Sequence, residues 1–519
     1  MTRNRCRTIR ILAGMSLVFA LPFACSKPAA VEEAGPVPGA VDIRPADTAA
    51  ELAAKAARVV PSERQLRWQA LEFQAFVHFG MNTFTDREWG EGTEDPKLFD
   101  PSDLDAGQWV EAVQAAGIRG LIVTAKHHDG FCLWPSGFTE HSVQSSPWKD
   151  GKGDVVGEVA AACRKAGLAF GVYLSPWDRH EPSYGDSPRY NEHFKNQLRE
   201  LLTRYGDISE VWFDGACGEG PNGKRQVYDW TGYFALIREL QPDAVISIMG
   251  PDARWIGNEA GVTRASEWSV IPVVGFDDAP SDKNPGGIAG LDAQAADLGS
   301  LDRIAAAARQ GGRLLWYPGQ VDVSIRPGWF YHAAEDDKIK TLDHLLHIYD
   351  TSVGGNAQLL LNIPPDKRGR IHENDALRLK ELGDRLKATF AVNLAGDAVV
   401  ARSDAGGAGP EGSGPSWVFE LSGPMRFNVA MIREDLRQGQ RIEAFAFDAW
   451  TGQEWQEIAA GTTVGWKKLM RFPALTADKV RVRILRARGE VPPIVPPDAF
   501  GLYLDPFRPP QEGVKPKFL

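Results

Sequence analysis

Residues 210–215 read Glu-Val-Trp-Phe-Asp-Gly, a short and mainly apolar run that ends in an acidic residue and a glycine. Residues 120–130 repeat this arrangement as Gly-Leu-Ile-Val-Thr-Ala-Lys-His-His-Asp-Gly, with charged and imidazole side chains after the apolar run. Short apolar runs of this kind are typical of parallel strands that are buried on both faces. The two segments therefore predict a sheet of the α/β class.

Eight such runs occur between residues 73 and 362. Helical patterns separate them, as where Trp109, Val110 and Val113 recur at helical spacing. Eight strands with helices between them predict a (β/α)8-type barrel rather than a doubly wound sheet. The predicted strands are Phe73–Phe79, Gly120–Ala125, Ala169–Ser175, Glu210–Asp214, Ala244–Met249, Arg264–Val270, Arg313–Tyr317 and Gln358–Asn362.

The last part of the chain has a different pattern. After a predicted helix at Ala376–Phe390, apolar residues stand at every second position, as at Trp417 and Phe419. A period of two is typical of strands with one buried face. We therefore expect a (β/α)8-like catalytic domain over residues 62–390 and a β-sandwich over residues 391–519.

The composition is that of a globular protein. Of the 519 residues, 43% are aliphatic, aromatic or cysteine and 24% are charged, which excludes a disordered chain. The net charge is −10 and no basic block follows the first ten residues, so nucleic acid is not an expected partner. The 16 Trp and 24 Phe residues are consistent with sugar binding, although buried aromatic residues are the commoner case.

Residues 1–24 predict a signal peptide. Arginines precede an uncharged apolar run, Ile11–Ala24, which is too short to span a bilayer stably. The run ends in Leu-Pro-Phe-Ala-Cys and resembles a bacterial lipobox with Cys25 as the lipidated residue, although the leucine stands one place further from the cysteine than usual. An ordinary cleaved signal is the alternative. We expect an exported protein, periplasmic or an outer-membrane lipoprotein, that meets the membrane only through Cys25, with residues 25–61 as a tether.

Polar and aromatic side chains gather at the carboxyl ends of the predicted strands, where barrels of this type build their active sites. Each has an ordinary structural explanation, such as a buried histidine for His128 or a turn for Asp214. Together they favour a catalytic site. The residues at these strand ends include His78, His127, His128, Asp129, Tyr173, Trp177, Trp212, Asp214 and Trp316.

The adjacent His127 and His128 raise the question of a metal site. Neighbours on a strand point to opposite faces, so both can bind one ion only where the strand has already ended. No HExxH sequence or cysteine pair supports a metal, and we expect no metal and no cofactor. Beyond Cys25 the chain holds three cysteines without metal-like spacing, so no disulfide framework is implied.

Four motifs resemble the α-L-fucosidases of glycoside hydrolase family 29, over about Trp68–Lys387. Residues 254–261 and 322–329 further resemble the subgroup that cleaves branched α-1,3/1,4-linked fucose. The four family motifs are His78-Phe79-Gly80, Lys126-His127-His128-Asp129-Gly130-Phe131, Trp212-Phe213-Asp214-Gly215-Ala216, and Gly354-Gly355-Asn356 followed by Leu359-Leu360-Leu361-Asn362-Ile363-Pro364.

The resemblance implies an exo-acting, retaining enzyme that removes terminal L-fucose from branched, Lewis-type glycans through a covalent fucosyl-enzyme intermediate. Retention requires one carboxyl as nucleophile and a second as acid/base, about 5–5.5 Å apart. The resemblance places the nucleophile at Asp214 and the acid/base at Glu259, with Glu267 as the alternative. It places substrate-binding side chains at His78, Glu88, Trp89, His127, His128, Tyr173, Trp212 and Trp316.

Three functions remain open at this point. The first is a fucosidase whose partner is a fucosylated oligosaccharide or glycoconjugate. The second is a non-catalytic carbohydrate-binding protein on the same fold, and the third is another retaining barrel glycosidase. Candidates for both carboxyls are present, which favours the enzyme.

Overall fold

The computed structural model describes residues 35–274, 292, 294–403, 414–492, 494 and 498–507. The predicted signal peptide and Cys25 lie outside these residues, as does much of the loop predicted between Val270 and Ser300. Within the described ranges, no helix is both long enough and apolar enough to cross a membrane.

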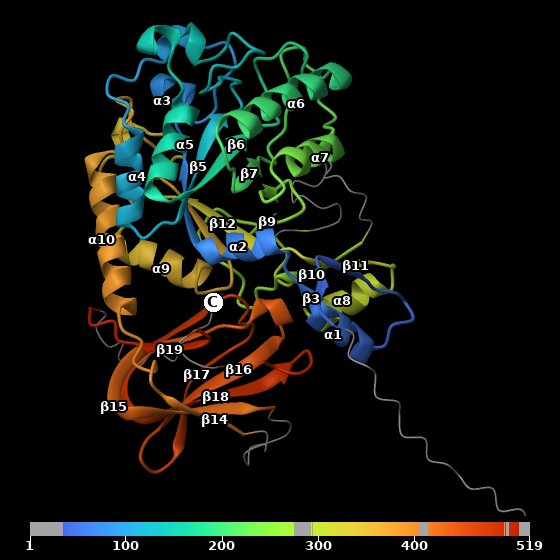
Figure 1. The fold of residues 1–519 in the computed structure, drawn as a ribbon, viewed down its shortest axis with the longest axis vertical. Helices are drawn as coiled ribbons and strands as arrows, with labels where there is room; N and C mark the ends of the chain where they lie inside the picture. The colour runs from blue at the N-terminus through green and yellow to red at the C-terminus, as the bar shows by residue number, and fades with distance from the viewer. Residues whose placement is uncertain are drawn as a thin grey trace, which may run out of the picture. The chain divides into compact units, whose positions relative to one another are not determined.

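Eight parallel strands form the barrel (Figure 1). Hydrogen bonds join them in the order β8-β7-β6-β5-β4-β13-β12-β9, and a parallel bridge between Ser247 and Ala253 links the two ends of this order. The predicted (β/α)8-type fold is thereby confirmed as a nearly closed barrel. The strands are β4 (Phe73–Val77), β5 (Gly120–Lys126), β6 (Ala169–Leu174), β7 (Glu210–Phe213), β8 (Val245–Ile248), β9 (Arg254–Trp255), β12 (Gly319–Ser324) and β13 (Gln358–Asn362).

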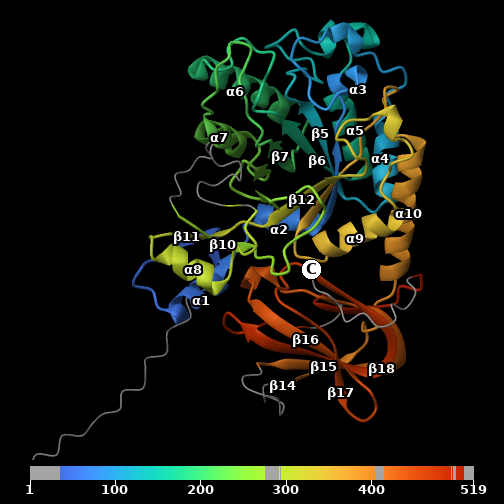
Figure 2. The same ribbon diagram turned by 180° about the vertical axis from the view of Figure 1, so that it is seen from behind.

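Helices alternate with most of the strands and cover the outside of the barrel (Figures 1 and 2). Helix α5 shows how the sequence defines them. The Asp154 carboxylate accepts a hydrogen bond from the Gly157 N–H (2.8 Å), and Gly167 ends the helix with a φ of 72°. The covering helices are α4 (Ala106–Ala115), α5 (Val155–Ala166), α6 (Ser187–Arg204), α7 (Trp230–Leu240), α9 (Leu342–Ser352) and α10 (Glu373–Phe390).

Two of the predicted barrel strands are wrong. Residues 264–269 form no strand, and β11 (Arg313–Trp316) pairs with β10 (Val270–Val273) and β2 (Ala40–Asp42) in a separate antiparallel sheet, here called the side sheet. The sixth and seventh barrel strands are β9 and β12 instead. The apolar side chains of β11 pack in part with helices α1 (Ala49–Arg58) and α8 (Leu301–Ala308), so hydrophobicity identified a strand but not the sheet to which it belongs.

Part of the predicted tether is folded. Helix α1 (Ala49–Arg58) begins at a Thr48 cap and buries Leu52 and Ala56 in an apolar cluster with α8 (Leu301–Ala308). Strands β1 (Val37–Pro38) and β3 (Val59–Val60) flank it, and α2 (Glu63–Leu71) follows. The buried face of α1 consists largely of alanine. Because an alanine-rich segment resembles a linker in composition, the sequence predicted a tether here.

The interior of the barrel has a polar layer and an apolar layer. At the amino ends of the strands, the Glu210 carboxylate accepts hydrogen bonds from Trp68 Nε1 (2.7 Å), Gln74 Nε2 (2.7 Å) and Gln320 Nε2 (2.9 Å). Closer to the carboxyl ends lies an apolar layer that supports any site built above it. Its members are Phe76, Ile122, Tyr173, Trp212, Ile248 and Leu360.

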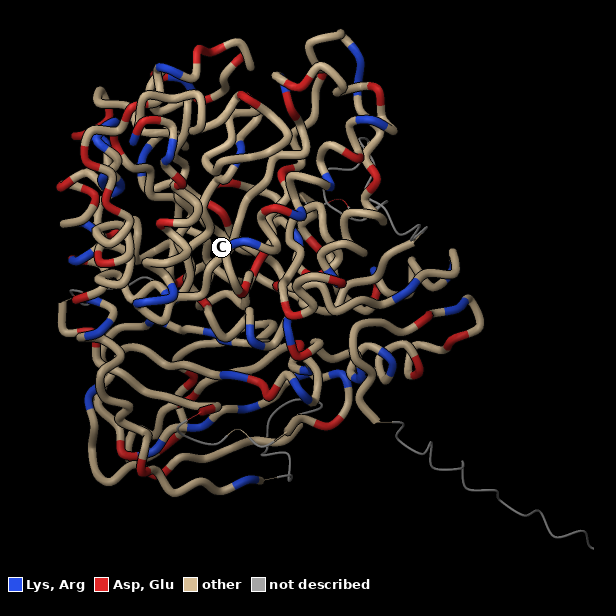
Figure 3. The backbone as a smooth tube through the Cα atoms, turned by 45° about the horizontal axis from the view of Figure 1, so that its top comes forward, with Lys and Arg blue, Asp and Glu red and all other residues tan. Residues whose placement is uncertain are grey.

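The C-terminal region is an antiparallel β-sheet domain around its own apolar core. It contacts the barrel through Glu72, whose carboxylate accepts hydrogen bonds from Arg433 Nη2 (2.7 Å) and Trp466 Nε1 (2.8 Å). Charges of both signs are interspersed along the chain (Figure 3). The strands are β14 (Val399–Ser403), β15 (Ser416–Ile432), β16 (Ile442–Trp450), β17 (Trp455–Gly461), β18 (Lys468–Ala487) and β19 (Phe500–Tyr503).

Candidate active site

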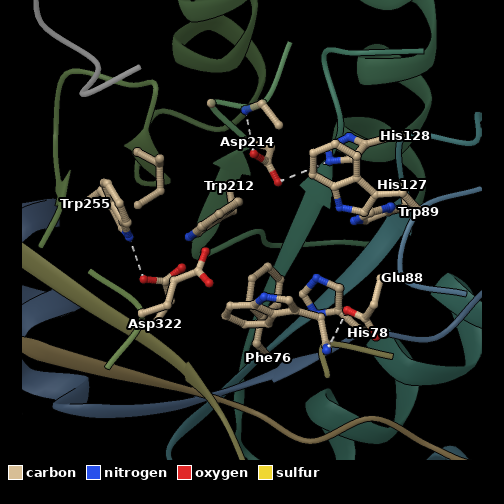
Figure 4. A pocket seen from close by; sticks show the side chains of 15 residues that line it. Phe76, His78, Glu88, Trp89, His127, His128, Trp212, Asp214, Trp255 and Asp322 are labelled. Atoms are coloured by element: carbon tan, nitrogen blue, oxygen red, sulfur yellow. Dashed lines mark hydrogen bonds and ion pairs between the residues drawn. The ribbon is translucent and has the colours of Figure 1, made fainter. Parts of the chain in front are cut away.

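A pocket of about 500 Å³ opens at the carboxyl ends of the barrel strands (Figure 4). Phe76, Trp212 and Ile248 of the apolar layer form part of its lining. Ile248 has a φ of 66°, a left-handed conformation that is costly for a β-branched residue and therefore marks a constrained point of the site. The lining residues are Phe76, His78, Glu88, Trp89, His127, His128, Trp212, Asp214, Gly215, Ala216, Ile248, Trp255, Glu259, Asp322 and Trp329.

Asp214 follows β7 directly and lines the pocket. Its Oδ2 accepts a hydrogen bond from the Tyr173 hydroxyl (2.9 Å), and its Oδ1 accepts one from the Ala216 N–H (2.7 Å). His128 Nε2 lies 3.8 Å from Oδ2. These contacts orient the carboxyl group, and its side chain remains 24% exposed, so a ligand in the pocket can reach it.

Three histidines line the pocket. His78 Nδ1 lies 2.8 Å from Asn362 Oδ1, and His128 Nδ1 lies 2.7 Å from Ser175 Oγ. His127 and His128 both reach the pocket because β5 ends just before them, at Lys126. Burial lowers the pKa of all three, that of His78 to about 4, so they are neutral at neutral pH. A neutral imidazole held through one nitrogen can present the other to a hydroxyl group.

Glu88 and Trp89 reach the pocket from the loop after helix α3 (Met81–Thr85). The Glu88 carboxylate accepts a hydrogen bond from the Trp329 N–H (2.8 Å), which joins this loop to the segment after β12. Trp89 is 53% exposed and packs edge-on against His128, with 5.3 Å between the ring centroids. It therefore presents an aromatic face at the rim, beside the histidines (Figure 4).

Glu259 is an exposed residue in the segment after β9 and lines the pocket. Partial burial and the negative charge of Asp214 raise the pKa of its carboxyl group, against a hydrogen bond with the Trp329 side chain that lowers it. The pocket thus holds a carboxyl group with a raised pKa together with Asp214.

Glu267, the alternative acid/base, does not line the pocket. Its side chain is 1% exposed and forms ion pairs with Arg254 and with Arg264 Nη1, the latter at 3.2 Å. Its N–H donates to Thr463 Oγ1 (2.9 Å) in the C-terminal domain. These contacts give Glu267 a structural role between the barrel and that domain.

The other three aromatic side chains predicted to bind substrate have different positions. Trp212 lines the pocket and donates from Nε1 to Gln320 Oε1 (2.9 Å). Tyr173 stacks on Trp212 in the apolar layer, so it reaches Asp214 rather than the pocket surface. Trp316 does not reach the pocket: it ends β11 in the side sheet, is 1% exposed and donates to Gln69 Oε1 (3.1 Å). This correction follows from the wrong assignment of β11 to the barrel.

Several lining residues were not predicted as site residues. Trp255, Asp322 and Trp329 belong to the two motifs that resemble the branched-fucose subgroup, so a signal for them was present. Phe76 and Ile248 lie within apolar strands, where nothing in the sequence distinguishes a residue facing a pocket from one in the core.

The pocket combines carboxyl groups, neutral imidazoles and exposed aromatic faces. This set suits an uncharged ligand that carries hydroxyl groups and an apolar face, and its carboxyl groups suit nucleophilic and acid/base chemistry. Over the parts of the chain that the structure describes, no three His, Cys, Asp or Glu side chains converge as a metal site requires.

Comparison with known proteins identifies the family. The α-L-fucosidase family model matches residues 53–262 and 306–389. An α-L-fucosidase 1 from Arabidopsis thaliana is 41% identical over 475 residues, which cover 86% of this chain and 88% of the relative.

Solved structures show the same relationship. A Bacteroides ovatus protein assigned this activity is 48% identical with a TM-score of 0.83, covering 93% of this chain and 80% of that one. A Ruminococcus gnavus family 29 fucosidase, solved with fucose bound, is 32% identical with a TM-score of 0.72, covering 86% and 95%. The carboxyl-bearing pocket therefore belongs to a catalyst rather than to a non-catalytic sugar-binding protein, and the chain is a member of the α-L-fucosidases of glycoside hydrolase family 29.

Proposed function

We propose that the enzyme hydrolyses fucosides with retention and that Asp214 is its nucleophile. The supporting observation is the pair of hydrogen bonds from Tyr173 and Ala216, which aim this carboxyl group from the end of β7 into the pocket. In the first step Asp214 bonds to carbon 1 of fucose as the bond to the leaving oxygen breaks, and in the second step water releases the sugar.

We propose Glu259 as the acid/base of both steps. It lines the same pocket as Asp214 and has a raised pKa, as a proton donor at neutral pH requires. Glu267 is a poor candidate because two buried arginines hold its carboxylate outside the pocket. The hydrogen bond with the Trp329 side chain holds the Glu259 carboxyl group in the pocket.

The proposed substrate is terminal fucose linked α-1,3 or α-1,4 in a branched, Lewis-type glycan. Its support is that the two subgroup motifs contribute directly to the pocket, through Trp255, Glu259, Asp322 and Trp329. Contacts to the neighbouring branch sugar would then lower the barrier of the chemical step, because binding energy from remote groups can be used in the transition state.

Initial rates of fucose release from a Lewis trisaccharide and from a linear α-1,2-fucosylated trisaccharide test this substrate assignment. We expect the Lewis trisaccharide to be cleaved at least about tenfold faster in kcat/KM, the effect of roughly 1.4 kcal/mol of additional transition-state binding. Equal rates on the two would contradict the linkage assignment and leave the fucosidase activity itself intact.

We also propose that the enzyme is exported and anchored through a lipid on Cys25, on the support of the N-terminal sequence alone. The several acyl chains of a bacterial lipoprotein hold a protein at a membrane, whereas one chain does not. A Cys25→Ala variant should move from the membrane fraction to the soluble fraction. A wild-type protein that is already soluble and begins downstream of Cys25 would exclude the anchor.

A further inference from the structure

Each of the three histidines that line the pocket is held from behind by one polar side chain. The contact is made through Nδ1, and among the described residues Nε2 has no hydrogen-bond partner, so a ligand can bond to it. A neutral imidazole has one proton: the nitrogen that carries it donates, and the bare nitrogen accepts. The partner of Nδ1 therefore decides what Nε2 offers to a ligand. The pairs are His78 with Asn362, His127 with Asn82 and His128 with Ser175, and Figure 4 shows the histidines.

Asn362 makes His78 an acceptor. The Asn362 Nδ2 donates to the Trp329 carbonyl (2.8 Å), and its Oδ1 accepts the His78 backbone N–H (3.3 Å), so the amide has one orientation. The ring of His78 places Nδ1 2.8 Å from the same Oδ1. An amide oxygen accepts and does not donate, so Nδ1 carries the proton and Nε2 is bare.

Ser175 makes His128 an acceptor in the same way. The Ser175 Oγ donates to the Trp177 carbonyl (2.6 Å), which uses the one proton of the hydroxyl group. His128 Nδ1 lies 2.7 Å from this Oγ, and a bare Nδ1 would leave two acceptors in contact, so Nδ1 donates. The Asp214 carboxylate attracts a proton to the Nε2 of His128, but at 3.8 Å it lies beyond hydrogen-bond distance and does not replace that contact.

Asn82 makes His127 a donor. Asn82 is fully buried, and its Nδ2 donates to the Glu88 backbone carbonyl (3.1 Å), which fixes the orientation of the amide. The same Nδ2 lies 3.4 Å from His127 Nδ1. An N–H at Nδ1 would face the N–H of the amide, so Nδ1 accepts and the proton is on Nε2. This contact is the longest of the three, so a substitution should change the tautomer of His127 most easily.

We propose that these two asparagines and this serine are positioning residues that fix the tautomers of the three pocket histidines. His78 and His128 then accept hydrogen bonds from the substrate, and His127 donates one. The inference rests on the proposed binding of fucose in this pocket. Two bare nitrogens require groups on the ligand that donate, and the hydroxyl groups of a sugar supply both donors and acceptors.

Nuclear magnetic resonance of the protein with 15N-labelled histidine tests the tautomers directly. A bare imidazole nitrogen and one that carries a proton have widely separated 15N shifts, and single substitutions assign the signals among the 10 histidines of the chain. At neutral pH, where burial keeps all three neutral, we expect Nδ1–H at His78 and at His128 and Nε2–H at His127. The opposite tautomer at any one of them would overturn the proposal.

The same spectra separate the tautomers from the proposed function, because they require no turnover. Adding fucose should move the Nε2 signals of all three histidines, since these nitrogens contact the sugar. Unmoved Nε2 signals would overturn their role in substrate binding, whatever the rate of fucoside hydrolysis.

Ser175→Ala removes the partner of His128 Nδ1. The charge of Asp214 then favours the proton on Nε2, so the spectrum should show Nε2–H at His128. With the fucosyl trisaccharide that the wild type cleaves fastest, kcat/KM should fall about tenfold, the effect of one lost hydrogen bond, because a substrate hydroxyl loses its acceptor. A His128 that keeps its Nδ1–H form in this variant would show that Ser175 does not set the tautomer.

Ser352→Ala is the matched control. Ser352 is as fully buried as Ser175, and its Oγ also donates to a backbone carbonyl, that of Ile348, but it lies in helix α9 on the outside of the barrel. This variant should change neither the histidine signals nor kcat/KM. Equal effects of the two substitutions would overturn the role of Ser175 as a positioning residue.

Asn82→Leu provides the corresponding test at His127. It removes the N–H that faces Nδ1, so the Nδ1–H form should appear beside the Nε2–H form, while His78 keeps its tautomer. A His127 that remains wholly in the Nε2–H form would show that Asn82 does not fix it. If either variant does not fold, the wild-type spectrum decides.

Discussion

Replacing Glu267 should destabilise the protein without changing its chemistry. The Glu267 carboxylate is 1% exposed and neutralises Arg254, which is fully buried, and Arg264, which is 10% exposed. Removing one partner of a buried ion pair costs about 3–5 kcal/mol, because the remaining charge is left without compensation. Glu267→Gln keeps the side-chain volume and one acceptor oxygen, so we expect the lower end of this range, about 3 kcal/mol.

A loss of about 3 kcal/mol in the free energy of unfolding should lower the melting temperature by roughly 5 °C. The melting temperature of a larger cooperative unit changes less for each kcal/mol of lost stability. Glu259→Gln changes a partly exposed side chain at the rim and should leave the melting temperature almost unchanged. Thermal unfolding followed by circular dichroism measures both variants under the same conditions.

Kinetic measurements should show the opposite difference between the two glutamates, with the activity depending on Glu259 rather than on Glu267. Loss of a general acid costs about 10²–10⁴-fold in rate where the leaving group needs a proton and much less where it does not. Glu259→Gln should therefore lose most activity on a fucosyl oligosaccharide and retain more on an activated aryl fucoside, with a flattened alkaline limb. Glu267→Gln should keep the wild-type ratio between these substrates. A leaving-group dependence in Glu267→Gln at an unchanged melting temperature, without one in Glu259→Gln, would show that Glu267 is the acid/base and that Glu259 is not.

Three further predictions concern the pocket and the domain contact. Asp214→Gly should lower kcat by more than about 10³-fold. Azide should restore turnover by forming β-fucosyl azide, which NMR can detect. Wild-type rates in this variant would exclude Asp214 as nucleophile. Tyr173→Phe removes a hydrogen bond to a carboxylate worth about 1.5–3 kcal/mol, so kcat should fall about 10–100-fold, and an unchanged kcat would show that the bond does not matter in the transition state. Fucose affinity, measured by calorimetry, should stay constant from pH 8 to pH 5 and fall near pH 4, because His78 stays neutral until its lowered pKa is reached. A loss of affinity already near pH 6.5 would contradict burial as the factor that sets the pKa of His78.

The part of the site that could be predicted from the sequence is the part that follows apolar strands. Asp214 and His128 each stand at the end of a β-branched or aromatic run, and such a run marks both the strand and its carboxyl end. Glu88 and Trp89 lie in a loop without any periodic pattern, and only the family resemblance pointed to them.

Trp316 shows the limit of the same reasoning. The predicted strand Arg313–Tyr317 exists as β11, Arg313–Trp316, but its hydrogen bonds go to β10 and β2 in the side sheet. Apolar character indicates that a face of a segment is buried, but it does not indicate which other element covers that face. A residue predicted from its place at a strand end is therefore only as reliable as the assignment of that strand to the barrel.

Strand β12 was not predicted because it is not a continuous apolar run. Its polar residues are also what it contributes to the site. Its sequence, Gly-Gln-Val-Asp-Val-Ser, alternates polar and apolar residues, as a strand with one face in water would. Here the polar face points into the barrel: Gln320 bonds to Glu210, Asp322 to Trp255 and Ser324 to Asn362. A strand that supplies polar side chains to an active site carries them on its inward face, whereas strands such as β4 and β8 line the same pocket with apolar residues. Alternation within an otherwise apolar parallel barrel is thus itself a signal for the wall of a polar pocket.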